Sequence, residues 1–202
     1  MVPDPKAQRN FTDPESKIMK VSNKGWDQCG NAQAMANAQQ IILAADVTAE
    51  PNDKRQVEPM FQQTRESLKA ARVKEKVKHG LMDAGYYSEA NVKYLERRKA
   101  EPFIATGRLK HHEEAGVTPR GRMPEDLSAK QRMARKLRTR RGKALCAKRK
   151  GIIEPIFGQI KQVLGFRQFL LRGLAKIRAE WRLVCLTHNM LKLYRKVALV
   201  NG

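Results

Sequence analysis

The sequence lacks the features of membrane-spanning and disulfide-rich proteins. Its longest apolar runs, such as residues 41–45, are far too short to cross a bilayer, and no apolar segment follows the N-terminal charges to form a signal peptide. The cysteines are few and odd in number, and none forms a Cys-x-x-Cys pair, which argues against a disulfide framework or a cysteine zinc site: Cys29, Cys146 and Cys185. We therefore expect a soluble, cytoplasmic protein.

Acidic residues are scarce in the second half of the chain. The 202 residues carry 41 Lys and Arg against 20 Asp and Glu, a formal charge of +21, and beyond Leu127 the only acids are Glu154 and Glu180. Residues 132–150 hold ten Lys and Arg and no acid. Such an excess indicates a polyanionic partner, most often nucleic acid, because each cation that neutralises a phosphate releases counterions. The alternative is a solvated helix face or a disordered basic tail, but apolar residues recur within the run and favour an ordered, DNA-facing element.

The order of strand and helix signals predicts an α/β fold. The length suits one domain, with Pro and Gly residues favouring an irregular segment over residues 1–38. Apolar runs predict strands at 39–48, 76–82 and 102–106, and three-to-four spacing predicts helices at 54–75 and 88–98. The predicted domain has three parts: residues 39–106 hold these strands and helices, residues 107–127 form a loop, and residues 128–202 form a basic helical part. Gly165 and Gly173 are expected to interrupt the helices of the last part.

Two acids are candidates for chemistry. Asp83 closes a predicted strand just before Gly85, and carboxylates at strand ends can hold hard cations such as Mg²⁺; an ordinary turn is the alternative. Glu154 lies in an apolar patch within the most basic part of the chain, where nearby cations favour its ionised form. Its alternative is a helix first turn, where a carboxylate complements the helix dipole ahead of Pro155. The residues alone leave both choices open.

Residues 146–196 closely resemble the C-terminal part of bacterial insertion-sequence transposases of the DDE class. That group carries a signature of Tyr, two residues, Arg, three residues, Glu, six residues, Lys. Glu154 and Lys161 have the required six residues between them, Arg149 and Lys150 lie at or next to the Arg position, and Cys146 replaces the Tyr. The block at 82–88 is similar to the family's second catalytic Asp, here Asp83, and the segments at 10–16 and 41–48 also resemble the family.

The resemblance implies an RNase H-like (integrase-type) fold that cleaves and joins DNA. Three acids of the family hold two Mg²⁺ or Mn²⁺ ions for in-line attack on a phosphodiester. Here it implies Asp83 and Glu154 as catalytic and metal-binding residues. It also implies double-stranded DNA of transposon ends as the partner, a homo-oligomer, and a place in the bacterial cytoplasm at the nucleoid. The cations expected to contact DNA are Arg138, Arg140, Arg141, Arg149, Lys150 and Lys161.

The chain departs from the family pattern at its first catalytic acid. No Asp-Gly-Thr motif is present, and the sequence opens on the segment that normally follows that motif's strand. We therefore predict a fold that is incomplete at its N-terminus, from a truncated copy without the first Asp. Asp46, at a predicted strand end, is a substitute or an ordinary turn residue, and Asp13 is a similar case. Two functions remain, a DDE transposase and a non-catalytic, basic nucleic-acid-binding remnant.

Overall fold

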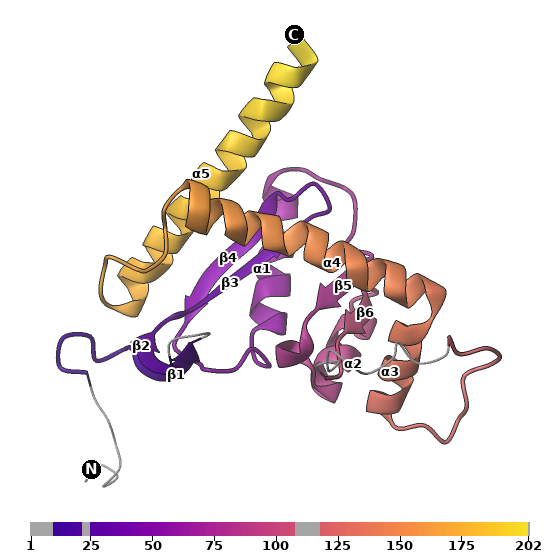
Figure 1. Cartoon of the computed structure of the whole chain (residues 1–202). Helices are drawn as coiled ribbons and strands as arrows, with labels where there is room; N and C mark the ends of the chain where they lie inside the picture. Colours follow the sequence, from indigo (N-terminus) through magenta and orange to yellow (C-terminus); the bar gives the residue numbers. More distant parts are fainter. Residues whose placement is uncertain (1–9, 22–24, 108–117, 202) are drawn as a thin grey trace, which may run out of the picture.

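The computed structural model describes residues 10–21, 25–107 and 118–201, and within these ranges the fold is mixed α/β (Figure 1). The strands form three pairs. β1 (Lys17–Val21) and β2 (Gly25–Cys29) are antiparallel, as are β3 (Asn31–Ala36) and β4 (Ile42–Thr48). β5 (His79–Met82) and β6 (Glu101–Ile104) are parallel. In this described part of the chain no sheet has a third strand.

The expectation of an irregular segment at 1–38 is wrong, because β1, β2 and β3 lie within it. The β1–β2 hairpin buries only Met19 among its ten strand residues. A hairpin with so little buried surface shows no clear alternation of apolar and polar residues, so the sequence does not predict its two strands. Pro14 lies before β1 and therefore removes no hydrogen bond from the pairing.

The strands and helices expected at 39–106 are present, most with shorter bounds, and β6 begins one residue earlier than expected. α1 (Val57–Ala70) lies between β4 and β5, and α2 (Glu89–Arg97) between η1 (Ala84–Tyr86), a short 3₁₀ helix, and β6. Ser88 caps α2, since its hydroxyl accepts from the Asn91 N–H at 3.1 Å. The three-to-four spacing of α1 buries Val57, Met60, Phe61 and Thr64 against the core.

The second half is helical, as expected. α3 (Ala129–Arg138) begins at a capping box of Ser128 and Gln131. α4 (Arg140–Gly158) continues into a π-helical turn, η2 (Gln159–Val163), and α5 (Leu174–Asn201) completes the chain. Gly165 and Gly173, the predicted breaks, have positive φ values of 69° and 86°. The additional break at Thr139, which caps α4, was not predicted. Of the loop expected at 107–127, residues 108–117 lie outside the described ranges.

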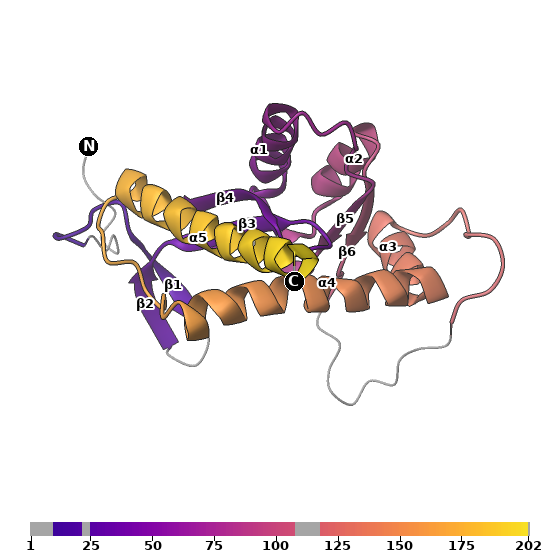
Figure 2. The ribbon, with the colours of Figure 1, turned by 90° about the horizontal axis from the view of Figure 1, so that it is seen from above.

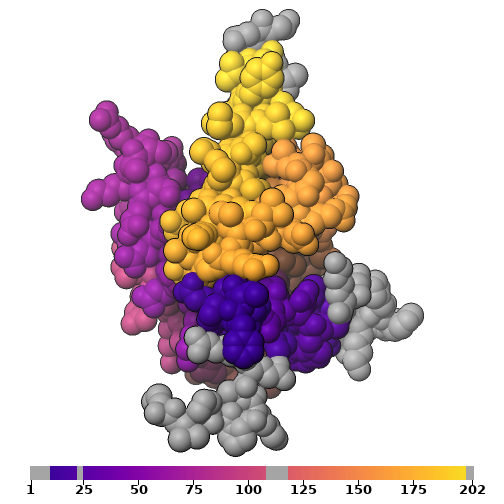
Figure 3. Space-filling view, turned by 90° about the vertical axis from the view of Figure 1, so that its left-hand side faces the viewer, coloured from indigo at the N-terminus to yellow at the C-terminus, as the bar shows by residue number. Residues whose placement is uncertain are grey.

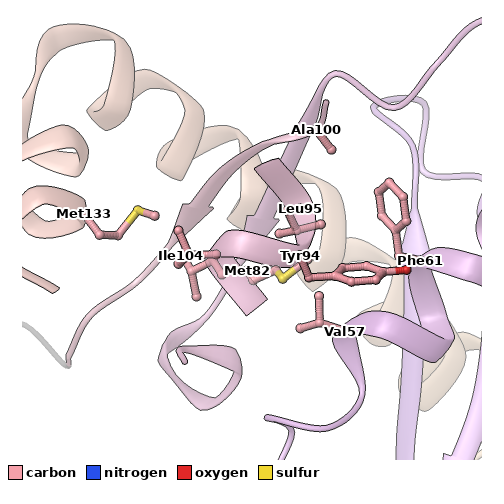
Figure 4. Packing of buried hydrophobic residues seen from close by; sticks show 9 residues of the cluster. Val57, Phe61, Met82, Tyr94, Leu95, Ala100, Ile104 and Met133 are labelled. Atoms are coloured by element: carbon pink, nitrogen blue, oxygen red, sulfur yellow. The ribbon is translucent and has the colours of Figure 1, made fainter. Parts of the chain in front are cut away.

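Two apolar clusters form the core, and α4 runs along both strand pairs that they support (Figures 1 and 2). The first joins α1, α2, β5 and β6, and Figure 4 shows Leu95, Tyr94 and Phe61 within it. The second joins β4 to α4, η2 and α5. Because α4 contributes to the second cluster and also contacts β5 and β6, it ties the two strand pairs together.

α5 covers the outer edge of β4. The Asn189 side chain accepts from the Ile42 N–H and donates to the Ile42 C=O, both at 2.8 Å, much as a neighbouring strand would. Arg178 Nε and Arg182 Nε donate to the C=O groups of Val47 and Ala45. The C-terminal part of α5 projects beyond the body of the molecule (Figures 1 and 3). No helix in the described ranges is both long and apolar enough to span a membrane.

Candidate functional site

Asp83 lies where β5 ends, as the sequence predicts. It is exposed, and its Oδ1 accepts from the Gly85 N–H at 2.9 Å, which starts the short helix η1. The carboxylate is therefore fixed by the backbone that follows the strand, rather than by another charged side chain. Its second oxygen, Oδ2, makes no hydrogen bond to any residue that the structure describes.

Asp53 is a second carboxylate at this place, and the sequence interpretation missed it. It follows Pro51 and Asn52 after β4. Its Oδ1 accepts from the side-chain amides of Asn31 and Gln33 on β3, each at 2.8 Å. The i, i+2 spacing of these two amides puts them on one face of the strand, where both can reach the same oxygen. That arrangement leaves Oδ2 of Asp53 directed toward Gly85.

Both carboxylates lie close to Gly85. A Cβ on Gly85 would lie 2.7 Å from Asp53 Oδ2 and 3.2 Å from Asp83 Oδ1. The absence of a side chain at this position therefore lets the carboxylates approach. No ion pair with either aspartate occurs within the described ranges.

Tyr86 closes one side of this pair. Its hydroxyl donates to Gln33 Oε1, the same side chain that holds Asp53. Burial raises the pKa of Tyr86 far above its usual value, the charges of Asp53 and Asp83 raise it further, and the hydrogen bond to Gln33 opposes them. The phenol therefore stays protonated and serves as a hydrogen-bond donor.

Glu154 lies on α4, in the basic half of the chain. It is exposed near the C-terminal end of α4, and it does not line the cavity of about 980 Å³ that Asp53 and Asp83 border. The alternative of a helix first turn is excluded, because α4 begins fourteen residues earlier at Arg140. Pro155 cannot donate to the Gly151 C=O, and Gln40 Nε2 donates to that oxygen instead at 2.9 Å.

Asp46 has a structural role. Its Oδ1 lies 2.9 Å from Arg178 Nε and 3.7 Å from Arg182 on α5, and it does not line the cavity beside Asp83. Asp46 therefore helps to fix α5 to β4. Asp13, the other substitute considered, lies just before β1, where its C=O accepts from the Ser16 N–H.

The donors at Asp53 and Asp83 suit a hard divalent cation, but they are few. Carboxylate oxygens are the ligands that Mg²⁺ and Mn²⁺ favour. No group of three or more His, Cys, Asp or Glu close enough to hold a metal occurs in the part of the chain that the structure describes. The pair therefore fits one ion completed by water or phosphate oxygens, and it is short of the carboxylates that two ions require.

The cations expected to contact DNA fall into two groups. Arg138, Arg140, Lys150 and Lys161 are exposed, and none of them forms an ion pair within the described ranges. By contrast, Arg141 is bound to Glu101 at 2.5 Å, and Arg149 is half-buried in the cavity wall.

The model of the transposase DDE domain family matches residues 4–190. The chain belongs to this family. A DDE-type transposase acts on DNA, in agreement with the basic surface of its second half. No curated protein and no solved structure matches the chain. Membership of the family therefore supports DNA transposition as the general activity. Which residues take part in it has to be inferred from the geometry around Asp83.

Proposed function

We propose that this DDE domain cleaves and joins DNA phosphodiesters, with a divalent metal held between Asp53 and Asp83. The observation that carries the proposal is the approach of the two carboxylates across Gly85 at the end of β5. Asp83 is the acid that the family resemblance assigns, and Asp53 is its neighbour in space. Bound Mg²⁺ or Mn²⁺ would polarise the phosphodiester and acidify an attacking water or 3′-hydroxyl.

The protein's own groups orient this chemistry. Asn31 and Gln33 hold the Asp53 carboxylate in one orientation, and the Gly85 N–H holds that of Asp83. The exposed cations of α3 and α4 would hold the DNA backbone through its phosphates. Glu154 is proposed as a further catalytic and metal-binding acid on the strength of its six-residue spacing to Lys161.

We propose that cleavage by this chain alone is slow, in line with the expected loss of the first acid. Only Asp53 and Asp83 among the three proposed acids line the cavity, and two carboxylates hold two metal ions poorly, because the ions repel each other and too few oxygens remain. A non-catalytic DNA-binding remnant is the second candidate. The exposed position of Glu154, outside the cavity beside Asp83, is the observation that favours it.

We further propose that the protein forms a homo-oligomer through α5 and acts at the bacterial nucleoid, on insertion-sequence ends. The exposed apolar residues of α5 alternate in steps of three and four, the spacing that pairs one helix with another copy of itself. These residues are Leu183, Leu186, Met190, Leu193 and Val197.

A plasmid-nicking assay with Mn²⁺ tests the proposed activity. We expect slow nicking of supercoiled DNA that disappears on chelation and falls at least tenfold in Asp83→Asn and in Asp53→Asn. Asp46→Asn, which alters a carboxylate bound to α5, should nick at the parental rate once circular dichroism shows that it is folded. If DNA binding persists with no nicking by any protein, the non-catalytic function is correct and the metal-site proposal is wrong.

A further inference from the structure

The loop that joins η2 to α5, residues 165–173, carries two neighbouring leucines at the surface. Leu170 is 75% exposed and Leu171 is 48% exposed. The loop lies at one end of the molecule, where the chain turns back from α4 and η2 into α5 (Figure 1). Single exposed apolar residues are common in proteins and need no explanation. Two adjacent leucines on a short loop form an apolar tip, and what holds this tip outward is visible in the contacts around it.

The backbone of the tip is fixed by a carboxylate. Glu180 Oε1 accepts from the Leu170 N–H at 3.0 Å, and its Oε2 accepts from the Leu171 N–H at 3.2 Å. Glu180 is one of the only two acids beyond Leu127, and it forms no ion pair within the described ranges. In this strongly basic half of the chain, the carboxylate therefore serves to hold the leucine backbone in place rather than to pair with a cation.

The other apolar side chains of the loop are packed inward. The rings of Phe166 and Phe169 meet edge to face, with their centroids 5.6 Å apart, and Phe166 lies 6.2 Å from the ring of Trp181 on α5. All three belong to the second apolar cluster. The phenylalanines thus fill the space under the loop, and the two leucines stay at the surface above it.

The surroundings of the tip are positively charged. Between Glu154 and Glu180 the sequence has five Lys and Arg and no acid. Arg167 and Arg172 lie on either side of the tip, and both are exposed without an ion pair in the part of the chain that the structure describes. Glu15 reaches this region, but its Oε2 accepts from the Leu174 N–H at 2.8 Å, at the start of α5. Apolar residues flanked by arginines are typical of protein segments that enter the minor groove of DNA.

The loop is attached to the fold beside the residues that hold Asp53. A Cβ on Gly30 would lie 2.9 Å from Ile177 Cδ1 and 3.7 Å from Phe169 Cε2. Gly30 directly precedes Asn31, whose side-chain amide donates to Asp53. The loop and the proposed metal site are therefore attached to the same end of β3.

We propose that Leu170 and Leu171 form a wedge that enters the minor groove of duplex DNA and separates two stacked base pairs. Arg167 and Arg172 contact the phosphates on either side of the wedge. The inference rests on the proposed function in that it takes DNA as the substrate. Burial between the bases removes the leucines from water and offsets the lost stacking. Because pyrimidine–purine steps unstack most easily, the wedge favours steps such as TpA.

A fluorescence experiment on the whole chain tests the wedge. The probe is a duplex of about 20 base pairs with one central TpA step, in which 2-aminopurine replaces the adenine and becomes brighter when it unstacks. The buffer contains a chelator, and anisotropy sets a protein concentration that saturates the duplex. We expect the parent protein to raise the fluorescence at least about twofold, and Leu170→Ser/Leu171→Ser to leave it unchanged. The matched control, Leu170→Met/Leu171→Met, should keep the rise, because methionine also serves as an apolar wedge.

The outcomes separate this proposal from the proposed cleavage. A rise of the same size with the serine protein, or no rise with the bound parent, overturns the wedge and leaves cleavage to the plasmid assay. Asp83→Asn should keep the full rise, because no metal takes part in this measurement. A rise without any nicking by the parent supports the wedge and contradicts the cleavage alone.

Vesicles of anionic phosphatidylglycerol provide a second probe, because an apolar tip between arginines also suits a membrane surface. We expect the parent and the serine protein to bind these vesicles equally weakly. If the parent binds them, the serine protein does not, and the fluorescence of the DNA probe stays flat with both, the tip is a membrane contact and the wedge is wrong.

Discussion

Gly142 and Gly151 lie on the same helix, α4, in opposite surroundings. Gly142 is buried where α3 meets α4, and a Cβ there would lie 2.2 Å from the Lys136 C=O oxygen and 2.8 Å from the Leu137 Cα. Both atoms belong to backbone, which cannot turn aside as a side chain can. Gly151 is exposed, with nothing within 4 Å of such a Cβ.

We therefore expect Gly142→Ala to lower the free energy of unfolding by about 1–3 kcal/mol, the usual cost of overpacking. Gly151→Ala should raise it by as much as about 1 kcal/mol, because alanine favours the helix. Urea denaturation followed by circular dichroism measures both. A Gly142→Ala protein as stable as the parent would show that α3 and α4 do not pack as described.

The candidate site shows which residues a sequence can reveal. Asp83 could be proposed from the sequence because its signal is local, an acid at the end of an apolar run and before a glycine. Asp53 was missed because its role depends on amides of Asn31 and Gln33, about twenty residues earlier, and on Gly85, about thirty residues later. No local pattern in the chain records that convergence.

At the scale of elements, Glu101 joins β6 to two helices. Its carboxylate lies 3.0 Å from Lys136 of α3 and 2.5 Å from Arg141 of α4. Burial alone would raise the pKa of Glu101, but the hydrogen bonds and charges of Lys136 and Arg141 outweigh it and lower the pKa below its usual 4.5. The ionised carboxylate thus helps to hold α3 and α4 against the β5–β6 pair.

This lowered pKa predicts how stability depends on pH. A carboxylate whose pKa is lower in the folded state contributes fully above its unfolded pKa and loses that contribution as pH falls through the folded pKa. Glu101→Gln should therefore be less stable than the parent at pH 7, and the difference should shrink as pH falls below about 4.5. Denaturation curves at several pH values measure this. Glu96→Gln, an exposed change on α2 that removes one carboxylate outside this ion-pair cluster, is the matched control.

Elements with strong periodicity were predictable, and those that depend on distant partners were not. α1 and α2 carry apolar residues at helical spacing, and β4 carries an apolar run, so each was found within a few residues. β1 and β2 bury few side chains and are paired through their backbones. Backbone pairing does not depend on residue type, so the sequence does not reveal it. α4 continues through Pro155 because Gln40, 111 residues away, bonds to the carbonyl that the proline leaves free.

At the scale of the whole molecule, composition was the most informative signal. The excess of positive charge lies mainly in residues 101–202, which hold 24 Lys and Arg against 7 Asp and Glu. These residues include α3, α4 and α5, so these helices carry much of the excess. Composition could not show which cations stay free, and the pairing of Arg141 with Glu101 is visible only in the fold.

Duplex DNA should bind to the exposed cations of α3 and α4 with a steep dependence on salt. The logarithm of the association constant falls with the logarithm of the salt concentration by about 0.9 for each phosphate neutralised. Replacing Arg138, Arg140 and Lys150 with alanine should therefore reduce this slope by as much as about 3 and weaken binding at low salt. These three residues are exposed, and Arg141 is left in place because it holds Glu101.

The matched control removes the same charge from the other side of the fold, through alanine at Arg55, Arg65 and Lys69, on and just before α1. Anisotropy titrations of a labelled duplex between about 50 and 200 mM salt compare the two proteins with the parent. The control should keep nearly the parental slope, because its cations lie outside the expected contact surface. Equal losses in both proteins would mean that binding follows net charge alone. If the affinity of the parent protein does not change with salt, the protein does not contact DNA phosphates. Such contacts release counterions, and added salt reverses that release and weakens binding.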